Sequence, residues 1–426
     1  MNQGHSSRRS DCRLCGSKNL ELVLPLVPTP LADAYVSDDR RGEDQPVFNL
    51  DVFMCLDCAH VQLLEVVDPE VVFGKNFYTS RSSPDMEMHF RRYAPDVIGE
   101  FGLGNGDLAV DIGSNDGTLL GFLGDGGMRI LGIEPAAGIA ELARERGIPT
   151  VVSWIDVETA ERVRTEHGPA SLVTANNVFA HSDDMGEFAE AVRVLLGDQG
   201  IFIFEVNHLG DMVDNMAFDT IYHEHLAYHT VSPLRSFLAA HGLELFDVRP
   251  IATKGGSMRG FAQRVGGLRP VAAGVEQYVE RERKEGMLHP GYMESFRRRI
   301  EQRRDQVRMM LEEVGARTKI AVGFGASASS TTLLYHYGLN DYLSGLIDDW
   351  PERQGLFSPG LHLPVMSGDV LNSADAPESV VILAWRFWEA ILRNYSTYLG
   401  NGGRMLIPLP EPRWITDIDL ATPARA

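Results

Sequence analysis

The sequence predicts an α/β protein built on a doubly wound, mostly parallel sheet. Three observations predict this fold. Short apolar segments alternate with amphipathic helical segments between residues 76 and 265, a glycine-rich turn follows the first apolar segment, and the alternation resumes between residues 316 and 415. Apolar strands that alternate with helices are typical of a parallel sheet covered on both faces.

The composition is that of a globular protein with several domains. A length of 426 residues allows two to four domains of roughly 100–200 residues each. Lys and Arg number 39 and Asp and Glu number 59, which gives a net charge of −20. Because a phosphate backbone repels so acidic a chain, nucleic acid is not expected as the main partner. A small phosphorylated ligand in a local positive site stays compatible with this charge.

The sequence contains no segment typical of membrane insertion or secretion. It lacks an uninterrupted apolar run of about 18 residues, the length that predicts a membrane-spanning helix. Residues 1–10 are polar and lack the apolar core of a secretory signal. We therefore expect a cytoplasmic protein without a membrane partner. The oligomeric state is not indicated, and a monomer is compatible with the sequence.

Four regions follow one another along the chain. Residues 1–75 hold the cysteines and short strand-like segments, and residues 76–265 form the first alternating region. Residues 266–315 are highly charged, with apolar side chains at helical spacing, which predicts a helical connector with a solvated basic face. Phosphate contact by one of its arginines is the alternative. Residues 316–426 contain the second alternating region and a tail.

All four cysteines of the chain stand in two CxxC pairs. Cys12 and Cys15 form the first pair, and Cys55 and Cys58 form the second. Each pair can place two thiolates on one metal ion, and two pairs complete a tetrahedron without a position for water. We therefore predict a structural Zn²⁺ site. A redox motif fits less well, because neither pair lies between a strand and a helix.

The elements of the first alternating region can be placed in order. Strands are predicted at residues 108–112, 129–133, 149–152, 171–175 and 200–205, and helices between them, for instance at 118–123, 138–146 and 185–196. The carboxyl ends of parallel strands meet at one edge of the sheet, where open α/β sheets bind ligands.

The first of these strands runs into the sequence VDIGSNDG at residues 110–117. Gly113 and Gly117 allow a ligand to approach the backbone, and the following helix offers unpaired N–H groups. Glu134 ends the second strand, 23 residues after Asp111, and an acid there can accept hydrogen bonds from two ribose hydroxyls. This combination fits two cofactors, NAD and S-adenosylmethionine.

Three features favour S-adenosylmethionine. The spacing is DxGxxxG rather than GxGxxG, an acid closes the first strand, and two asparagines close the fourth. A tight turn without a ligand is the remaining alternative. The predicted cofactor contacts are Asp111, Gly113, Asn115, Gly117, Glu134 and Asn176.

The densest group of polar side chains follows the fifth strand, in FDTIYHEH at residues 218–225. Such density is rare in a core, because each buried polar group needs a partner. A histidine beside a glutamate can act as a general base, and a tyrosine can donate to a developing oxyanion. A structural role, or a metal held by His223, His225 and His229, stays open, although the HExxH spacing of zinc proteases is not met.

Three other segments leave alternatives open. His181, in ANNVFAH at residues 175–181, could contact a substrate or be structural. The sequence TKGGSMR at residues 253–259 could contact phosphate or form a turn between strands. Residues 319–328 predict a strand and a small-residue loop, which resemble a second nucleotide-binding half and make a dehydrogenase an alternative. A zinc-ribbon module that binds nucleic acid is disfavoured by the net charge.

The order of these blocks resembles the three-domain sugar C-methyltransferases of antibiotic deoxysugar pathways. These enzymes methylate C3 of nucleotide-linked 4-ketohexoses. The resemblance covers nearly the whole chain, and FDTIYHEH is its most specific block. The other blocks are the CxxC pairs, SNDG with GIEPA at 132–136, ANNVFAH, KGGSMR at 254–259, GFGAS at 323–327 and LAWRFWE at 383–389.

The resemblance implies a class I S-adenosylmethionine-dependent methyltransferase fold in the centre of the chain. It also implies an N-terminal zinc-binding domain and a C-terminal Rossmann-like domain that helps to hold a nucleotide-sugar. The nucleotide is expected to be thymidine diphosphate. Methylation at oxygen or nitrogen, or of another enolisable metabolite, is the alternative activity.

The resemblance further implies how the reaction proceeds. A base removes the C3 proton, which the neighbouring ketone acidifies, and the resulting enolate accepts the methyl group. His225 is the expected base, Glu224 orients it or shares the proton, and Tyr222 stabilises the enolate oxygen. The expected substrate contacts are Tyr78, Asn177, His181, Lys254 and Arg259.

Overall fold

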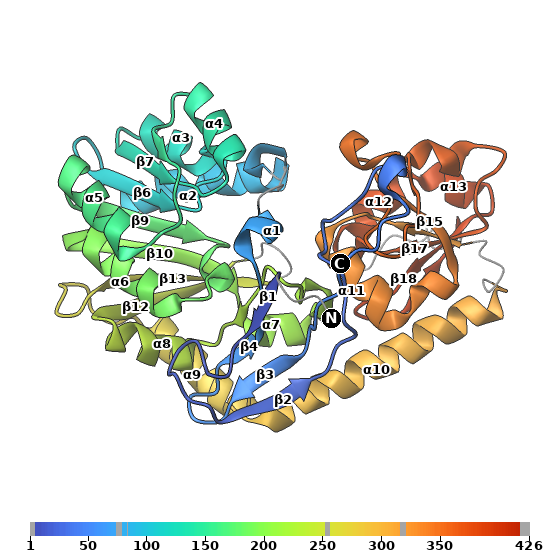
Figure 1. Cartoon of the computed structure of the whole chain (residues 1–426), viewed down its shortest axis with the longest axis horizontal. Coiled ribbons are helices and arrows are strands. Elements are labelled where there is room, and N and C mark those ends of the chain that lie inside the picture. Colours follow the sequence, from blue (N-terminus) through green and yellow to red (C-terminus); the bar gives the residue numbers. More distant parts are fainter. Residues whose placement is uncertain (1–4, 74–78, 83, 252–255, 316–320, 418–426) are drawn as a thin grey trace.

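The computed structural model describes residues 5–73, 79–82, 84–251, 256–315 and 321–417. Within these ranges the strands form four sheets, of seven, six, four and two strands. The seven-stranded and six-stranded sheets lie in two lobes, with the small N-terminal sheets between and below them (Figure 1). None of the described helices is both long and apolar enough to cross a membrane.

The seven-stranded sheet has the order β12-β13-β10-β9-β6-β7-β8. Strands β6 to β10 in this sheet run parallel, and β13 is antiparallel to both β10 and β12. The five strands predicted from the sequence are thereby confirmed, and an antiparallel hairpin is added at one edge. The strands are β6 (Leu108–Ile112), β7 (Arg129–Ile133), β8 (Thr150–Val151), β9 (Ala170–Asn176), β10 (Leu196–Asn207), β12 (Leu243–Ile251) and β13 (Ser257–Arg264).

Helices cover both faces of this sheet (Figure 1). Every residue of β6 is buried, as expected for a central strand between two helical layers. On one face lie α2 (Pro84–Phe101) and α3 (Thr118–Asp125). The remaining helices of this lobe are α4 (Ala137–Glu145), α5 (Val157–His167), α6 (Met185–Leu195), α7 (Leu209–Asp214), α8 (Val231–Ala240) and α9 (Ala273–Glu285).

The N-terminal region forms two small sheets. Strands β2 (Leu20–Leu24), β3 (Val52–Cys55) and β4 (Val61–Leu63) are antiparallel, and β1 (Ser6–Arg8) pairs with β5 (Glu65–Val67), which α1 (Pro69–Phe73) follows. The edge of the larger sheet is completed by β11 (Ala227–Tyr228), which pairs with β4. Because β11 directly follows the FDTIYHEH segment, this segment is joined to the N-terminal sheet.

The C-terminal lobe is a second parallel sheet with one antiparallel edge strand. Its order is β16-β15-β14-β17-β18-β19. The strands are β14 (Ala321–Phe324), β15 (Leu343–Ile347), β16 (Val365–Met366), β17 (Ser379–Ile382), β18 (Arg404–Ile407) and β19 (Arg413–Ile415), and the helices are α11 (Ala328–Tyr337), α12 (Trp388–Asn394) and α13 (Ser396–Gly400).

The charged region forms α9 and the long helix α10 (Pro290–Glu313), which runs along the base of the molecule toward the C-terminal lobe (Figure 1). Phe296 and Leu311 on the predicted apolar stripe are fully buried. Arg298 is mostly exposed and lies 3.6 Å from Glu294. Arg303 is mostly buried instead, and it donates to the carbonyl of Pro410 and to Glu411. The solvated basic face expected from the sequence is therefore present only in part.

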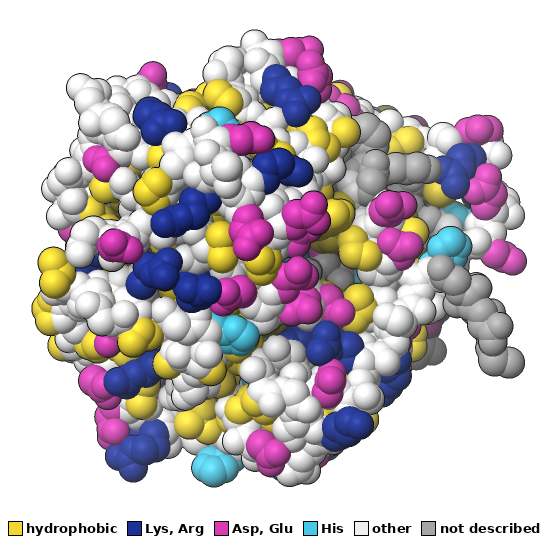
Figure 2. All heavy atoms as spheres, turned by 60° about the vertical axis from the view of Figure 1, so that its left-hand side comes forward, with side chains coloured by type: hydrophobic (Ala, Val, Ile, Leu, Met, Phe, Trp, Pro, Cys, Tyr) yellow, Lys and Arg dark blue, Asp and Glu magenta, His cyan; other side chains and the backbone are white. Residues whose placement is uncertain are grey.

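One apolar core joins the small sheet to the C-terminal lobe. It contains Leu24 and Met54 from the N-terminal strands, Phe218, Ile300 from α10, and Leu333 from α11. On the face shown in Figure 2, several acidic side chains lie close together near the middle, with basic side chains around them.

Candidate zinc centre and active site

The four cysteines converge on one point. Their Sγ atoms all lie within 4.8 Å of one another, with 3.5 Å between Cys12 and Cys58 and 3.6 Å between Cys15 and Cys55. A tetrahedral zinc with Zn–S bonds of about 2.3 Å requires sulfur–sulfur distances of roughly 3.8 Å. The thiolates therefore fit one structural Zn²⁺ ion, as the spacing predicted.

Both pairs reach this geometry through the same turn. The N–H of Gly16 donates to the carbonyl of Cys12, and the N–H of Ala59 donates to the carbonyl of Cys55. Gly16 and Ala59 are both left-handed, with φ of 70° and 64°. A left-handed alanine is disfavoured by about 1–2 kcal/mol, so the second turn is held by its surroundings.

The glycine-rich loop after β6 packs closely against residues 175–181. Gly113 has a φ of +65°, and a Cβ there would lie 2.4 Å from Val178 Cγ2. Only glycine therefore fits. Glu134, at the end of β7, accepts hydrogen bonds from the N–H groups of Asn115 at 3.0 Å and Ala136 at 2.9 Å. The acid expected to contact a ribose is thus fixed beside the loop.

Asp111 lies at the end of β6 and is buried. Burial raises the pKa of its carboxyl to about 7, a hydrogen bond from Thr174 lowers it, and the charge of Glu134 raises it further. On the neighbouring strand β9, both side-chain polar atoms of Asn176 are buried without a hydrogen-bond partner in the described part of the chain. These groups fit a bound ligand that carries hydroxyls and a positive charge.

A row of rings occupies the same edge of the sheet. The ring of His225 lies 4.2 Å from that of Tyr222 and 5.1 Å from that of His181, measured between centroids. His181 stacks in turn on Phe73 of α1, at 5.8 Å. The structure thus brings together three residues that the sequence predicted for catalysis and substrate binding.

The hydrogen bond of His225 fixes which ring nitrogen can take a proton. Nδ1 lies 2.7 Å from the carbonyl oxygen of Thr220. A carbonyl oxygen only accepts hydrogen bonds, so Nδ1 carries the hydrogen in the neutral ring. The lone pair is then on Nε2, which makes Nε2 the basic atom.

The other histidines nearby are placed differently. His223 packs edge-on against Phe48, and burial lowers its pKa to about 4. His229 stacks on Phe179 with its ring planes 9° apart, and burial lowers its pKa to about 3. Among the described residues the four cysteines are the one group arranged to hold a metal ion. The alternative of a metal bound by His223, His225 and His229 therefore finds no geometric support.

Of the remaining predicted substrate contacts, the structure describes Asn177 and Arg259. Asn177 is left-handed, with φ of 57°, and its N–H donates to the carbonyl of Glu205. Arg259 donates to the Glu205 carboxylate at 2.6 and 2.8 Å, so its charge is matched within the protein. Residues 257–259 of this segment begin β13, and residues 253–255 lie outside the described residues. Tyr78 and Lys254 lie outside the described residues.

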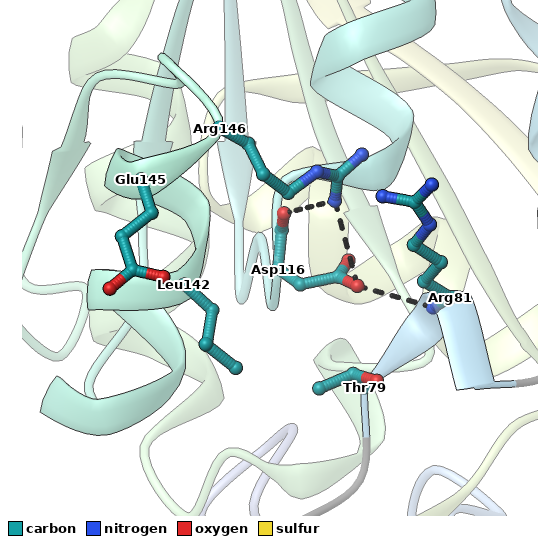
Figure 3. Close-up of a pocket in the computed structure, with 6 residues that line it drawn as sticks. All are labelled: Thr79, Arg81, Asp116, Leu142, Glu145 and Arg146. Atoms are coloured by element: carbon teal, nitrogen blue, oxygen red, sulfur yellow. Dashed lines mark hydrogen bonds and ion pairs between the residues drawn. The ribbon is translucent and has the colours of Figure 1, made fainter.

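A pocket of about 390 Å³ adjoins the glycine-rich loop (Figure 3). The N–H of Ser80 donates to the side chain of Asn115 at 2.8 Å, and that of Arg81 donates to Asp116 at 3.2 Å. This approach of residues 79–82 to the loop was not predicted, because no local pattern in the sequence indicates it. The pocket is lined by Thr79, Arg81, Asp116, Leu142, Glu145 and Arg146.

Comparison with known proteins follows the same division of the chain. The sequence matches a zinc binding domain over residues 12–73, a methyltransferase domain over residues 87–248 and the C-methyltransferase C-terminal domain over residues 252–410. It is 32% identical over 407 residues to C-methyltransferase NovU of Streptomyces niveus, across 95% of this chain and 97% of the relative. The chain belongs to the sugar C-methyltransferase family.

Two solved methyltransferases match less than half of this C-methyltransferase. One is CcbJ from Streptomyces caelestis, which is 13% identical over 46% of this chain and 96% of its own, with a TM-score of 0.35. The other is magnesium protoporphyrin IX methyltransferase from Synechocystis PCC 6803, which is 15% identical over 46% of this chain and 91% of its own, with a TM-score of 0.34.

The protein is accordingly an S-adenosylmethionine-dependent C-methyltransferase. Its central sheet is the class I methyltransferase fold, flanked by the zinc-binding domain and the Rossmann-like C-terminal lobe. The fixed Glu134, the buried Asp111 and the unpaired amide of Asn176 are the residues of the described site that suit this cofactor.

Proposed function

We propose that this enzyme methylates C3 of a nucleotide-linked 4-keto-deoxysugar, with thymidine diphosphate as the nucleotide, in the biosynthesis of an antibiotic deoxysugar. The observation that supports this proposal is the hydrogen bond from His225 Nδ1 to the Thr220 carbonyl. It directs the basic Nε2 atom away from the backbone. Carbon methylation needs a base that removes a proton from the substrate, whereas a neutral amine depends less on such a base.

The proposed reaction has two steps, removal of the C3 proton and transfer of the methyl group. His225 Nε2 takes the C3 proton, the electron pair of the C–H bond moves into the C3–C4 bond, and the carbonyl oxygen becomes an enolate. When bound, S-adenosylmethionine would supply an electrophilic methyl group to the enolate carbon, and its sulfur would keep the electron pair of the broken C–S bond.

Tyr222 is suited to stabilise the enolate oxygen. Burial raises the pKa of its phenol well above 10, and the charge of Glu224 raises it further. The phenol therefore stays protonated at neutral pH and can donate a hydrogen bond to the developing charge. His181, 5.1 Å from His225 between ring centroids, and Asn177 are proposed to contact the sugar.

Hydrogen exchange with solvent tests the proposal directly. The enzyme is incubated in D₂O with S-adenosylhomocysteine and a thymidine-diphospho-4-keto-6-deoxyhexose, and the C3 proton is followed by NMR. We expect enzyme-dependent loss of this signal. Absence of exchange with several C3 variants of the sugar, while S-adenosylhomocysteine still binds, would show that the acceptor is a different molecule.

A further inference from the structure

The carboxylate of Asp219 is held by two residues from the C-terminal lobe. Its side chain is 0% exposed and belongs to the short helix η4 (Phe218–Thr220). Trp385 donates its Nε1–H at 2.9 Å, and Arg386 donates to both carboxylate oxygens at 2.9 to 3.2 Å. A two-pronged guanidinium contact fixes orientation as well as position. We name Asp219, Trp385 and Arg386 the Asp219 clamp.

This clamp lies next to the contact that orients His225. The residue after Asp219 is Thr220, and its carbonyl oxygen bonds to His225 Nδ1 at 2.7 Å. The next carbonyl, that of Ile221, accepts a hydrogen bond from Thr332 Oγ1 on α11, also at 2.7 Å. The C-terminal lobe therefore holds the backbone on both sides of the Thr220 carbonyl.

Packing strengthens the same connection. The ring of Phe218 stacks on that of Tyr337 of α11, with 5.2 Å between centroids and 27° between planes. Phe218 and Ile221 belong to the apolar core shared with the C-terminal lobe. A shift of this lobe would therefore move the Thr220 carbonyl and the ring that it orients.

We propose that Trp385 and Arg386 are positioning residues for the base, and that Thr332 supports them. They act through Asp219 and the Thr220 carbonyl, without contact with the reacting atoms. This inference rests on the function proposed above, in which His225 removes the C3 proton. It assigns the LAWRFWE segment a role in setting the geometry of a catalytic group more than 150 residues earlier in the chain.

Two neighbouring threonines provide a matched pair of variants. Thr331 and Thr332 are both buried on α11, and each hydroxyl donates to a backbone carbonyl outside the C-terminal lobe. Thr332 bonds to Ile221 in the catalytic segment, whereas Thr331 bonds to Ala32 in the N-terminal region. Thr331→Val and Thr332→Val therefore each remove one hydrogen bond to a backbone carbonyl. Only Thr332→Val removes a bond to the segment that carries the Thr220 carbonyl and His225.

The experiment measures C3 exchange at saturating sugar nucleotide for Arg386→Lys, Thr332→Val and Thr331→Val. Loss of the planar fork in Arg386→Lys should misplace the ring and slow exchange about 10–100-fold, with S-adenosylhomocysteine affinity unchanged. Thr332→Val should slow exchange several-fold, and Thr331→Val should leave it unchanged. Equal effects of both threonine variants, or an unchanged rate in Arg386→Lys, would overturn the inference.

A second experiment shows whether Arg386 acts through His225. In a His225→Ala background rescued by added imidazole, Arg386→Lys should change the exchange rate less than threefold. The same large loss in both backgrounds would mean that Arg386 acts elsewhere. Failure of the proposed function is distinguishable, because the wild-type enzyme would then show no exchange at all.

Discussion

At the scale of single residues, His225 differs from its neighbours in having a fixed and basic nitrogen. We predict that His225→Asn lowers turnover by about 10²–10⁴-fold, because the amide cannot accept the C3 proton. Binding of S-adenosylhomocysteine, measured by calorimetry, should be retained. The measurement is turnover together with C3 exchange in D₂O.

His223→Asn is the matched control for this variant. His223 lies two residues away, but its ring is buried against Phe48 and its lowered pKa of about 4 makes it a weak base. We expect this variant to lose stability rather than the deprotonation step. Full activity in His225→Asn would show instead that another group, Glu224 or His223, removes the proton.

Asp111 predicts a pH dependence of cofactor binding. Its carboxyl has a pKa of about 7, raised by burial, and a cofactor with a positive sulfonium favours the ionised form. Cofactor binding should therefore release a proton, and the affinity for S-adenosylmethionine should rise about tenfold between pH 6 and pH 8.

The test compares the wild type with Asp111→Asn by calorimetry at several pH values. The asparagine removes the titrating group, so the difference between the two proteins isolates the carboxylate from the titration of the cofactor itself. Identical pH dependence in both proteins would show that Asp111 does not sense the bound charge.

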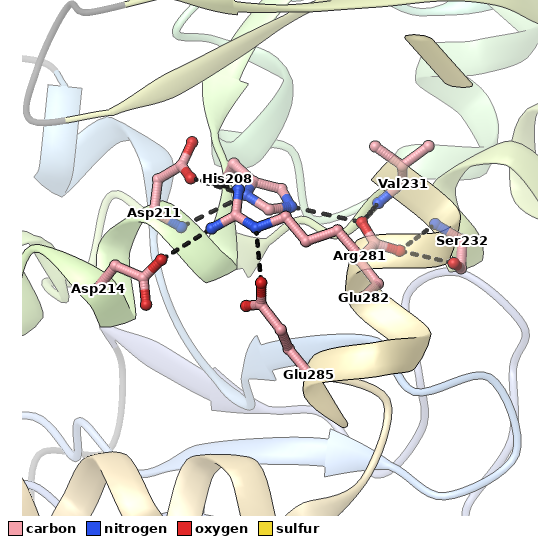
Figure 4. A network of polar contacts seen from close by, with 8 residues as sticks. All are labelled: His208, Asp211, Asp214, Val231, Ser232, Arg281, Glu282 and Glu285. Carbon is pink, nitrogen blue, oxygen red and sulfur yellow. Dashed lines mark hydrogen bonds and ion pairs between the residues drawn. The ribbon is translucent and has the colours of Figure 1, made fainter. Parts of the chain in front are cut away.

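At the scale of elements, a buried network joins three helices (Figure 4). Glu282 of α9 accepts hydrogen bonds from the N–H groups of Val231 and Ser232, at the start of α8. The Ser232 hydroxyl also donates to this carboxylate at 2.6 Å. His208 Nε2 lies 3.4 Å from Glu282, and Asp211 of α7 lies 3.5 Å from His208 Nδ1. One carboxylate thus serves both a helix N-terminus and a buried histidine.

This network predicts how stability changes with pH. Burial lowers the pKa of His208, but its contacts with Asp211 and Glu282 outweigh burial and raise the pKa above its usual 6.5. A raised pKa stabilises the fold below pH 6.5, and this contribution is lost as the pH rises through the folded-state pKa. His208→Asn should cost about 1–3 kcal/mol at pH 6 and less at pH 9.

Chemical denaturation at both pH values measures this difference. His289→Asn serves as the control, because His289 is exposed at the start of α10. A cost for His208→Asn that stays constant or grows with pH would contradict a protonated histidine in the network.

The elements that could be predicted from the sequence are those whose pattern is local. Strands β6 and β9 are mostly apolar because helices bury both of their faces, and their boundaries were predicted within one residue. The strands of the β12–β13 hairpin were not predicted, and a turn between strands at residues 253–259 stayed one of two alternatives, because the segment contains Arg249, Pro250 and Arg259. Those charges are matched only in the folded chain, by Glu100 and Asp247 for the first arginine and by Glu205 for the second.

The candidate site also has parts that the sequence predicts and parts that it does not. The glycine-rich loop and Glu134 follow from spacing along 25 residues, so the sequence was sufficient to predict their approach. The Asp219 clamp joins residues 166 and 167 positions apart. Nothing in the local pattern around Asp219 indicates its partners, because its pairing depends on how the C-terminal lobe packs against the apolar core.

At the scale of the whole molecule, the zinc centre is connected to the active site. Arg13 lies between the first two cysteines, and its side chain is fully buried. Its guanidinium donates to Asp183 at 3.1 Å, and to the side chain of Gln62 and the carbonyl of Leu63. Asp183 is two residues from His181, so the zinc-binding turn holds the chain that carries a proposed substrate contact.

Removal of zinc should therefore loosen the substrate side of the site before the cofactor side. After chelation, we expect hydrogen–deuterium exchange to accelerate in residues 5–68 and 179–186, while residues 108–134 around the glycine-rich loop stay protected. S-adenosylhomocysteine should still bind. Arg13→Met should reproduce the effect near residue 181 with zinc retained, as measured by metal analysis. Uniform loss of protection across all three segments would show instead that zinc supports the fold as a whole, with no selective connection to His181.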